Sequence, residues 1–184
     1  METSQRTPNY LIELTDFLDK PIESLINEIN KIEGIRLSDL KVRDLTYCND
    51  KLIEPGQGVY VFKTNEQILL IGKVSSKTFT ERIPEHFDIR PWAWFNTLMF
   101  IVCRKHFRFP ELSHGHKFSN DNYKKASEFV FENGKLVLIN MEHNLERIKE
   151  LESILRGTAE TLNKFKTRRY NKADILSNIL PPRL

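Results

Sequence analysis

Cysteine is scarce in this chain of 184 residues, which contains only Cys48 and Cys103. Two thiols cannot build a disulfide framework or a four-thiolate zinc site. Long hydrophobic runs are also lacking, because the longest apolar block, 98–103, falls far short of the roughly 18 residues that a membrane span needs. The first residues lack the apolar core of a secretory signal. We therefore expect a reduced, cytoplasmic protein without a membrane segment.

Glycine-rich phosphate-binding motifs are lacking as well, since neither G-x-x-x-x-G-K-[ST] nor G-x-G-x-x-G occurs in the sequence. What is present is ordinary for a globular protein, with 40% hydrophobic and 29% charged residues. This composition is too apolar for a disordered chain. The length suits one domain, or one domain with a small appendage.

Charge is unevenly distributed along the chain. The formal net charge is +3, yet residues 164–184 alone carry +5, so the preceding part carries −2. A second basic stretch, 104–125, is interleaved with aromatic residues. Basic side chains neutralise phosphates and aromatic rings stack on bases, so this pattern is compatible with a nucleic-acid partner. The alternative is a basic tail that is simply solvated.

The N-terminal part is predicted to be helical. Leucine and isoleucine recur at three- and four-residue spacing over 9–33, and Pro21 suggests two helices divided near Asp19. Gly34 would end the second helix. A further helical turn is expected in 38–45.

The rest of the chain is predicted to mix hairpins with helices. The apolar runs 58–63 and 67–72 suit one β-hairpin, and 129–132 with 135–140 suit another because Asn-Gly lies between them. The helices are expected at 77–86, interrupted by Pro84, at 92–107, and from Asn144 onward. This order predicts an α+β fold and not a doubly wound sheet.

The first hairpin and the helix after it contain the most informative motifs. Gly58-Val59-Tyr60 opens one strand, Leu70-Ile71-Gly72-Lys73 lies in the next, and Arg82 and His86 follow four residues apart. These motifs resemble the GIY-YIG nuclease family, in which a G-I-Y strand and a Y-I-G strand precede a helix that carries an essential arginine. The family then places a glutamate on a later helix and an asparagine beyond it.

The resemblance implies a role for each matching residue. Tyr60 is the expected general base, although a phenol with a pKa near 10 needs nearby cations to act as one. Arg82 would clamp the phosphate through bidentate hydrogen bonds, and His86 would assist proton transfer or phosphate binding. Glu152 would hold a divalent metal, Mg²⁺ or Mn²⁺, since Mg²⁺ commonly accepts one carboxylate together with waters and phosphate oxygens. Asn163 would brace the site.

Lys73, directly after Gly72, is expected to provide a further phosphate contact. Two features depart from the family pattern. Leu70 stands where the second motif tyrosine belongs, and a leucine cannot supply its hydroxyl. The segment between Gly72 and Arg82 is also longer than in the commonest members, which fits a longer turn before the helix.

The predicted architecture is therefore a small antiparallel or mixed sheet flanked by helices, GIY-YIG-like, with three parts along the chain. These are an N-terminal helical extension (1–55), a GIY-YIG-like nuclease domain (56–163) and a basic C-terminal tail (164–184). The expected function is metal-dependent hydrolysis of DNA phosphodiester bonds, with RNA left open as a substrate. A homodimer through the N-terminal helices is a further expectation.

Two other functions remain open from the sequence. A nuclease-like fold with impaired catalysis could bind nucleic acid without cutting it, which Leu70 would explain. Alternatively, residues 9–45 could serve a helical protein-interaction protein in which the hairpin has no catalytic role. Each site residue also has a structural interpretation. Arg82 could form a surface ion pair, and Glu152 could pair with Arg156 on a solvated helix face.

Overall fold

The computed structural model describes residues 9–90, 93, 95–112, 117–165 and 170–182. Its central sheet has the strand order β1-β7-β5-β6, with β2 paired to β7. The strands are β1 (Leu11–Glu13), β2 (Ile35–Arg36), β5 (Gly58–Lys63), β6 (Ile68–Val74) and β7 (Lys135–Asn140), and β3 (Tyr47–Cys48) and β4 (Lys51–Leu52) form a separate pair. Among the named strands of the described residues, β1 pairs parallel with β7 and the other strand pairs are antiparallel. The predicted α+β fold with a mixed sheet is confirmed.

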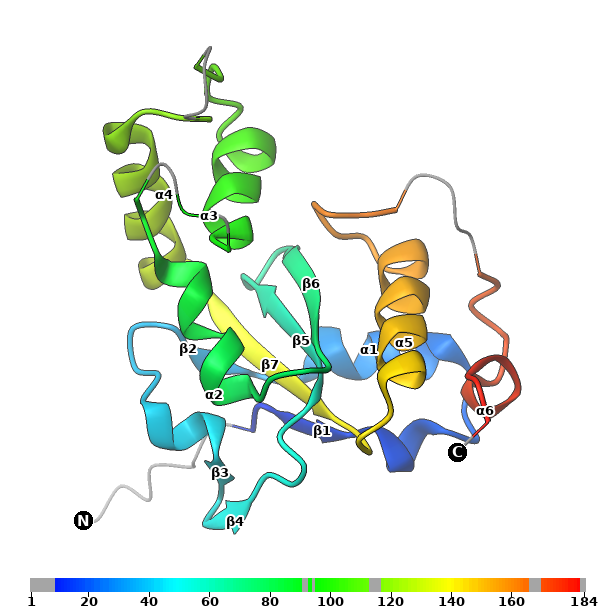
Figure 1. Ribbon diagram of the computed structural model, residues 1–184. Coiled ribbons are helices and arrows are strands. Elements are labelled where there is room, and N and C mark those ends of the chain that lie inside the picture. Colours follow the sequence, from blue (N-terminus) through cyan, green and yellow to red (C-terminus); the bar gives the residue numbers. More distant parts are fainter. Residues whose placement is uncertain (1–8, 91–92, 94, 113–116, 166–169, 183–184) are drawn as a thin grey trace, which may run out of the picture.

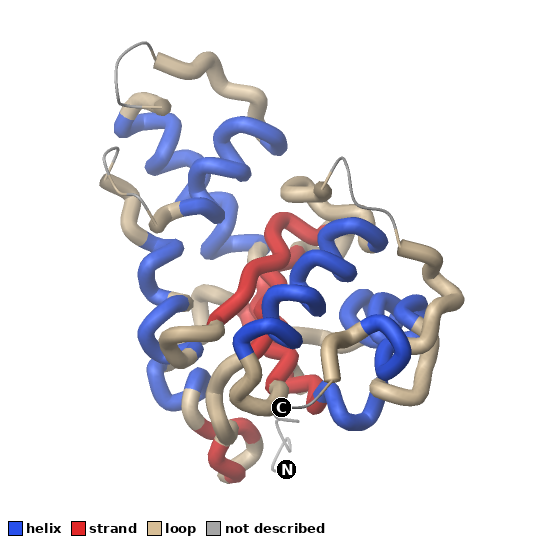
Figure 2. Tube along the Cα trace, turned by 45° about the vertical axis from the view of Figure 1, so that its right-hand side comes forward, coloured by secondary structure: helices blue, strands red, loops and turns tan. Residues whose placement is uncertain are grey.

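Helices cover both faces of this sheet (Figures 1 and 2). One face packs against α1 (Ile22–Lys31), α5 (Leu145–Thr158) and α6 (Leu176–Ile179), and the other against α2 (Phe79–Arg82), α3 (Thr97–Ile101) and α4 (Asn120–Asn133). Shorter turns complete the description: 3₁₀ turns at Leu14–Phe17, Val42–Leu45 and Pro84–Phe87, and a π turn at Val102–His106. Within the described ranges, no helix combines the length and apolar character needed to cross a membrane.

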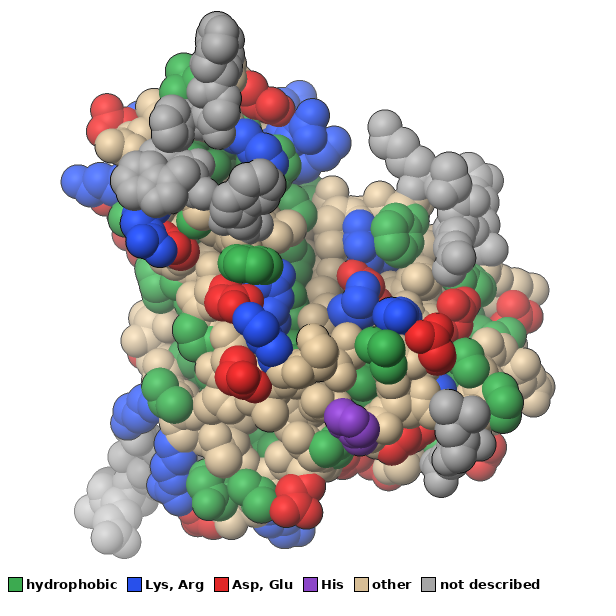
Figure 3. All heavy atoms as spheres, in the orientation of Figure 1, with side chains coloured by type: hydrophobic (Ala, Val, Ile, Leu, Met, Phe, Trp, Pro, Cys, Tyr) green, Lys and Arg blue, Asp and Glu red, His purple; other side chains and the backbone are tan. Residues whose placement is uncertain are grey.

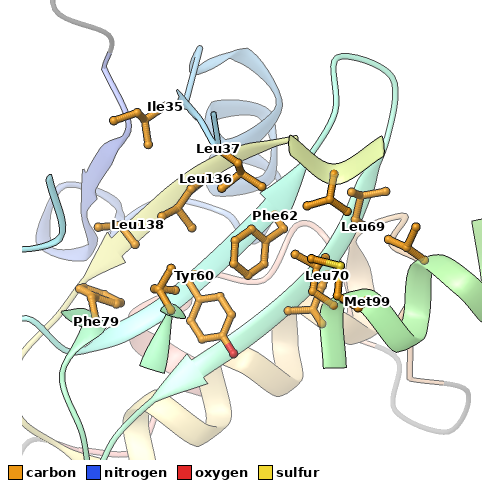
Figure 4. Packing of buried hydrophobic residues seen from close by; sticks show 14 of the residues in the cluster. Ile35, Leu37, Tyr60, Phe62, Leu69, Leu70, Phe79, Met99, Leu136 and Leu138 are labelled. Atoms are coloured by element: carbon orange, nitrogen blue, oxygen red, sulfur yellow. The ribbon is translucent and has the colours of Figure 1, made fainter. Parts of the chain in front are cut away.

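The alternating side chains of β5 divide the core into two clusters. Val59 and Val61 belong to the cluster under α1 and α5, whereas Tyr60 and Phe62 belong to the cluster under α2, α3 and α4. Figure 4 shows Tyr60 and Phe62 among the buried side chains of the second cluster, with Leu70 near them. Because both faces are covered, every residue of β5 is buried.

Three predicted elements are confirmed. The hairpin is β5 and β6, which pair antiparallel from Gly58↔Val74 onward. The helix after Asn144 is α5, and the Asn144 side chain caps it by accepting a hydrogen bond from the Arg147 N–H at 3.2 Å. The helix expected at 77–86 is broken at Pro84, as its proline indicates.

The helix predicted in 9–19 is wrong. This segment contains β1 and a 3₁₀ turn, and its buried residues alternate as Tyr10, Ile12 and Leu14. The edge of β7 decides the outcome, because Leu138 N–H donates to the Tyr10 carbonyl at 2.8 Å and β1 continues that ladder. A short segment has little helical stability of its own, so pairing with an existing strand overrides its spacing.

The second hairpin, at 129–140, is also wrong. Residues 120–133 form α4, and only 135–140 form a strand, β7. Gly134 ends the helix, and a Cβ there would lie 2.3 Å from the Val130 carbonyl oxygen and 2.6 Å from Leu37 Cδ1. The Asn-Gly pair therefore marks a close contact at a helix end and not a hairpin turn. The helix expected at 92–107 is shortened to α3 and the π turn after it.

The described part of the C-terminal region packs against the beginning of α1. The N–H groups of Ile22 and Glu23 donate to the carbonyls of Asp174 and Lys172 at 2.9 and 3.0 Å, and Leu176 is fully buried. Four basic residues of this region lie outside the described residues: Lys166, Arg168, Arg169 and Arg183. The apolar face of α1 is likewise used within the chain, where it packs against α5.

Lys63, at the end of β5, joins the sheet to the C-terminal end of α1. Its side chain is buried, and its ammonium donates to the carbonyls of Ile29, Asn30 and Ile32 at 2.7, 3.1 and 2.6 Å. Ile29 and Asn30 lie in the last turn of the helix and Ile32 is its C-cap, so these carbonyls have no intrahelical donor. The positive charge of Lys63 also interacts favourably with the negative end of the helix dipole.

We expect Lys63→Met to lower the free energy of unfolding by about 2–3 kcal/mol, because it leaves buried carbonyls without a donor. Urea denaturation followed by circular dichroism measures the change. The matched control is Lys31→Met, which removes an exposed lysine from the same helix end and should cost less than about 0.5 kcal/mol. Equal losses in the two variants would contradict this role of Lys63.

Candidate active site

Tyr60 and Gly72 face each other across the β5–β6 ladder, where their Cα atoms are register partners. The tyrosine ring lies directly over the glycine. A Cβ added to Gly72 would be 2.3 Å from both the Tyr60 hydroxyl oxygen and the ring carbon that carries it. Any side chain at position 72 would therefore displace the ring. The glycine of the predicted motif thus sets the position of the tyrosine hydroxyl.

His86 lies against this hydroxyl, with its Nε2 atom 2.6 Å from Tyr60 Oη. Burial, together with the charge of Arg82, lowers the pKa of His86 to about 3, so the imidazole is neutral at physiological pH. The Leu98 N–H, near the start of α3, donates to Nδ1 at 3.4 Å. Because a neutral imidazole has one donor and one acceptor nitrogen, Nε2 carries the proton and donates a hydrogen bond to Tyr60 Oη.

The Tyr60 oxygen is surrounded by groups with opposing effects on its proton. Burial raises the pKa of Tyr60 to about 12, while the Arg82 guanidinium lowers it through its charge and by hydrogen bonding. The carboxylates of Glu152 and Glu85 act in the same direction as burial. Donors aimed at the oxygen from His86 and Arg82 favour the phenolate. The site therefore holds a phenol that resists ionisation but whose anion has two donors in place.

Arg82 is the last residue of α2, and its Nη1 donates to Glu85 at 2.6 Å. Lys77 pairs with the other oxygen of the same carboxylate. The break at Pro84 places Arg82 and His86 on two consecutive turns, and both approach Tyr60.

An exposed aromatic ring lies beside these cations. Phe95 is 56% exposed, and its ring centroid is 5.5 Å from Lys77 Nζ and 5.6 Å from Arg82 Cζ. Phe95 is not among the predicted site residues. Its only sequence signal is its place in an aromatic cluster with Trp92 and Trp94, which lie outside the described residues.

Lys73 and Glu152 form a second group on the other face of β6. The Lys73 ammonium lies 2.5 Å from Glu152 Oε2, and Arg156 Nη1 donates to Oε1 at 3.0 Å. The Glu152 side chain is only 9% exposed, so the interpretation as a solvated helix face is wrong. The ring of Phe165 lies 3.6 Å from the Arg156 guanidinium carbon. The predicted phosphate contact, Lys73, is thus held by the predicted metal ligand.

Asn163 attaches the segment after α5 to the outer edge of β6. Its side chain accepts from the Ile71 N–H at 3.0 Å and donates to the Ile71 carbonyl at 2.7 Å. Arg156 Nε donates to the Asn163 carbonyl at 3.0 Å. Asn163 therefore links the edge strand to the arginine that holds Glu152, a geometry that suits a bracing role.

The structure brings most of the predicted site together at one edge of the sheet. Tyr60, Arg82 and His86 form one group, and the charge of Glu152 acts on Tyr60 from the other side of β6. In Figure 3, Lys and Arg side chains near the centre of this face lie over α2 and over α5. Asn163 is linked to the site through Arg156 and through the Ile71 backbone of β6.

The donor set limits the kind of metal site that Glu152 could provide. No group of three or more His, Cys, Asp or Glu side chains suited to a metal occurs among the described residues. Each oxygen of Glu152 has one cationic partner, and a carboxylate offers about four lone-pair sites, so acceptor capacity remains. These residues fit a single-carboxylate Mg²⁺ or Mn²⁺ site completed by water and phosphate oxygens. They do not fit a closed protein cage.

Comparisons with known proteins give no relative for this chain. No protein-family model matches it, and neither curated proteins nor solved structures yield a significant match. The resemblance to GIY-YIG nucleases therefore stays a prediction from the motifs, and the geometry of the site has to support any function independently.

We expect Gly72→Ala to destabilise the protein by about 1–3 kcal/mol, because the new methyl group overlaps the Tyr60 ring. Urea denaturation of a double-mutant cycle tests this cause. In a Tyr60→Ala background the ring is absent, so Gly72→Ala should cost little. If the cost is the same with and without the ring, the glycine is not required by Tyr60.

Proposed function

We propose that this protein is a metal-dependent endonuclease of the GIY-YIG type that hydrolyses DNA phosphodiester bonds. The observation that supports this most is the environment of the Tyr60 hydroxyl. The hydroxyl lies over Gly72 and accepts a hydrogen bond from His86. The charges of the Arg82 guanidinium and the Glu152 carboxylate both act on its pKa. A buried tyrosine hydroxyl needs one hydrogen-bond partner, which His86 provides, whereas the additional guanidinium of Arg82 suits a proton acceptor beside a phosphate.

Hydrolysis of a phosphodiester requires a proton acceptor for the attacking water and positive charge for the phosphorane. In its phenolate form Tyr60 takes the water proton and becomes a neutral phenol, and the hydrogen-bond donors of His86 and Arg82 stabilise that phenolate before the transfer. Arg82 has five N–H donors and uses one for Glu85, so it can also bind a phosphate oxygen. His86 is fully buried and acts through Tyr60, as a positioning residue.

Glu152 would hold the divalent ion, which when bound supplies positive charge for the phosphorane and leaving oxygen. Lys73 lies on the same carboxylate with its side chain 36% exposed, so its ammonium can also reach a phosphate from this position. Arg156 keeps the carboxylate oriented through its hydrogen bond to Oε1.

A nucleic-acid-binding module without cleavage is the second candidate. Two observations favour it. Tyr60 is only 2% exposed, and its pKa of about 12 keeps the hydroxyl protonated at neutral pH. Leu70 is buried in the apolar cluster beside Phe62, so the missing hydroxyl of the second motif tyrosine is not replaced at that position.

Cleavage of supercoiled plasmid DNA with Mg²⁺ or Mn²⁺, against an EDTA control, tests the proposal. We expect Tyr60→Phe, Arg82→Gln and Glu152→Gln each to lower the cleavage rate by about 10²–10³-fold, because each removes a transition-state interaction. The matched control is Arg43→Gln, which breaks an exposed ion pair with Asp50 and should leave the rate unchanged.

The other outcomes separate the candidate functions. Metal-dependent cleavage that survives all three changes would contradict the site assignment. Salt-sensitive DNA binding without any cleavage would support the binding module. Absence of DNA binding at low salt would overturn both nucleic-acid functions and favour a protein-interaction role.

The pH dependence of cleavage tests the role of Tyr60 as the base. Because burial raises the pKa of Tyr60 to about 12, its phenolate fraction is small at neutral pH and increases about tenfold per pH unit. We expect kcat/KM to rise steadily from pH 7 to pH 9, with a flat profile in Tyr60→Phe. A plateau in the wild-type protein below pH 9 would assign the base to another group.

A further inference from the structure

A pocket of about 500 Å³ lies at the C-terminal end of α5, beyond the candidate active site. Its volume falls in the range of pockets that hold small ligands. Three segments far apart in the sequence contribute to it: the π turn after α3, the chain that follows α5, and the start of the C-terminal region. The lining includes three lysines and three aromatic or apolar side chains: Lys105, Lys164, Lys172, Leu162, Phe165 and Tyr170.

Two aromatic rings of the pocket have defined positions. The Phe165 ring stacks on the Arg156 guanidinium at 3.6 Å, and the Phe165 N–H donates to the Arg156 carbonyl at 3.0 Å. The Tyr170 hydroxyl donates to Glu150 at 2.7 Å. Rings held in this way lose little conformational entropy when a planar ligand stacks on them.

The pocket also gathers positive charge. Lys164 lies 2.5 Å from the exposed carboxylate of Glu160, so part of its charge is balanced. Lys105 is exposed and forms no ion pair with the acids that the structure describes. Lys105, Lys164 and Lys172 thus outnumber Glu150 and Glu160, the two carboxylates that contact residues of the pocket. Cations together with a stacking ring are the features that bind single-stranded nucleic acid.

Arg156 connects the pocket to the candidate active site, because the same guanidinium contacts Phe165 and Glu152. We propose that this pocket binds one unpaired nucleotide of the DNA strand next to the scissile phosphate, with its base on Phe165 and its phosphate on Lys105. A base inside a duplex has both faces covered by its neighbours, so only an unpaired base can stack here. This inference rests on the proposed function and narrows its substrate to DNA with an unpaired nucleotide at the cleavage site.

Binding without cleavage tests the pocket separately from the nuclease. The full chain is titrated in EDTA into a fluorescein-labelled single-stranded 12-mer and its duplex, and anisotropy is recorded. We expect Phe165→Leu to weaken single-strand binding about tenfold and duplex binding by much less, because stacking on the ring is lost. Phe165→Tyr, which keeps the ring, should retain the affinity. Phe131→Leu removes another partly exposed ring, on α4, and should change neither affinity.

The salt dependence isolates the contribution of Lys105. Loss of one phosphate contact lowers the slope of log K against log salt for a single strand by about 0.7. We expect this change in Lys105→Gln and none in Arg43→Gln, which alters a 68% exposed arginine of the 3₁₀ turn at Val42–Leu45. Phe165→Leu should lower the affinity with the slope unchanged.

The outcomes for the pocket and for the nuclease are distinguishable. Single-strand binding that is absent, or that is unaffected by both Phe165→Leu and Lys105→Gln, overturns the pocket even if the plasmid is cleaved. The expected losses in a protein that never cleaves DNA support the pocket and contradict the nuclease. Circular dichroism of each variant confirms that the fold is retained.

Discussion

The register between β5 and β6 is the constraint on which the rest of the site depends. It places Tyr60 opposite Gly72, and only a glycine leaves room for the ring. A shift of one residue would turn Tyr60 toward α1 and α5, away from Arg82 and His86. The alternating apolar residues on both faces oppose such a shift, because each face has its own buried cluster. Packing of the core therefore determines where the hydroxyl lies.

The position of β6 at the edge of the sheet explains how groups from two faces can act together. Tyr60 belongs to one face, whereas Lys73 and Glu152 belong to the other, yet the carboxylate still affects the pKa of the hydroxyl. If β6 were an interior strand, a further strand would lie beside it and would separate the groups of the two faces. The outer edge of β6 is covered by the chain around Asn163, whose amide pairs with Ile71 as a neighbouring strand would. The edge is thus protected and the site is braced by one side chain.

The local motifs were predictable because their signals come from neighbouring residues. The β5–β6 hairpin follows from two short apolar runs with a polar linker, and α5 follows from its capping asparagine and apolar spacing. The helix predicted at 9–19 and the strand predicted at 129–132 are wrong because the structure of these segments depends on distant partners. The first segment pairs with β7, and Gly134 ends α4 against Leu37. Spacing and turn residues do not report on such partners.

The same distinction, between local signals and contacts with distant partners, applies to the candidate site. The sequence alone determined the residue types of the site and their order along the chain, because the motif residues are close in sequence or carried by strong local elements. Only the tertiary structure decided that Glu152 is buried between Lys73 and Arg156, that His86 is neutral and donates to Tyr60, and that Phe95 and Phe165 flank the cations. Burial and charge proximity depend on contacts between segments far apart in the chain. Protonation states and partners therefore follow from packing, which local sequence patterns do not specify.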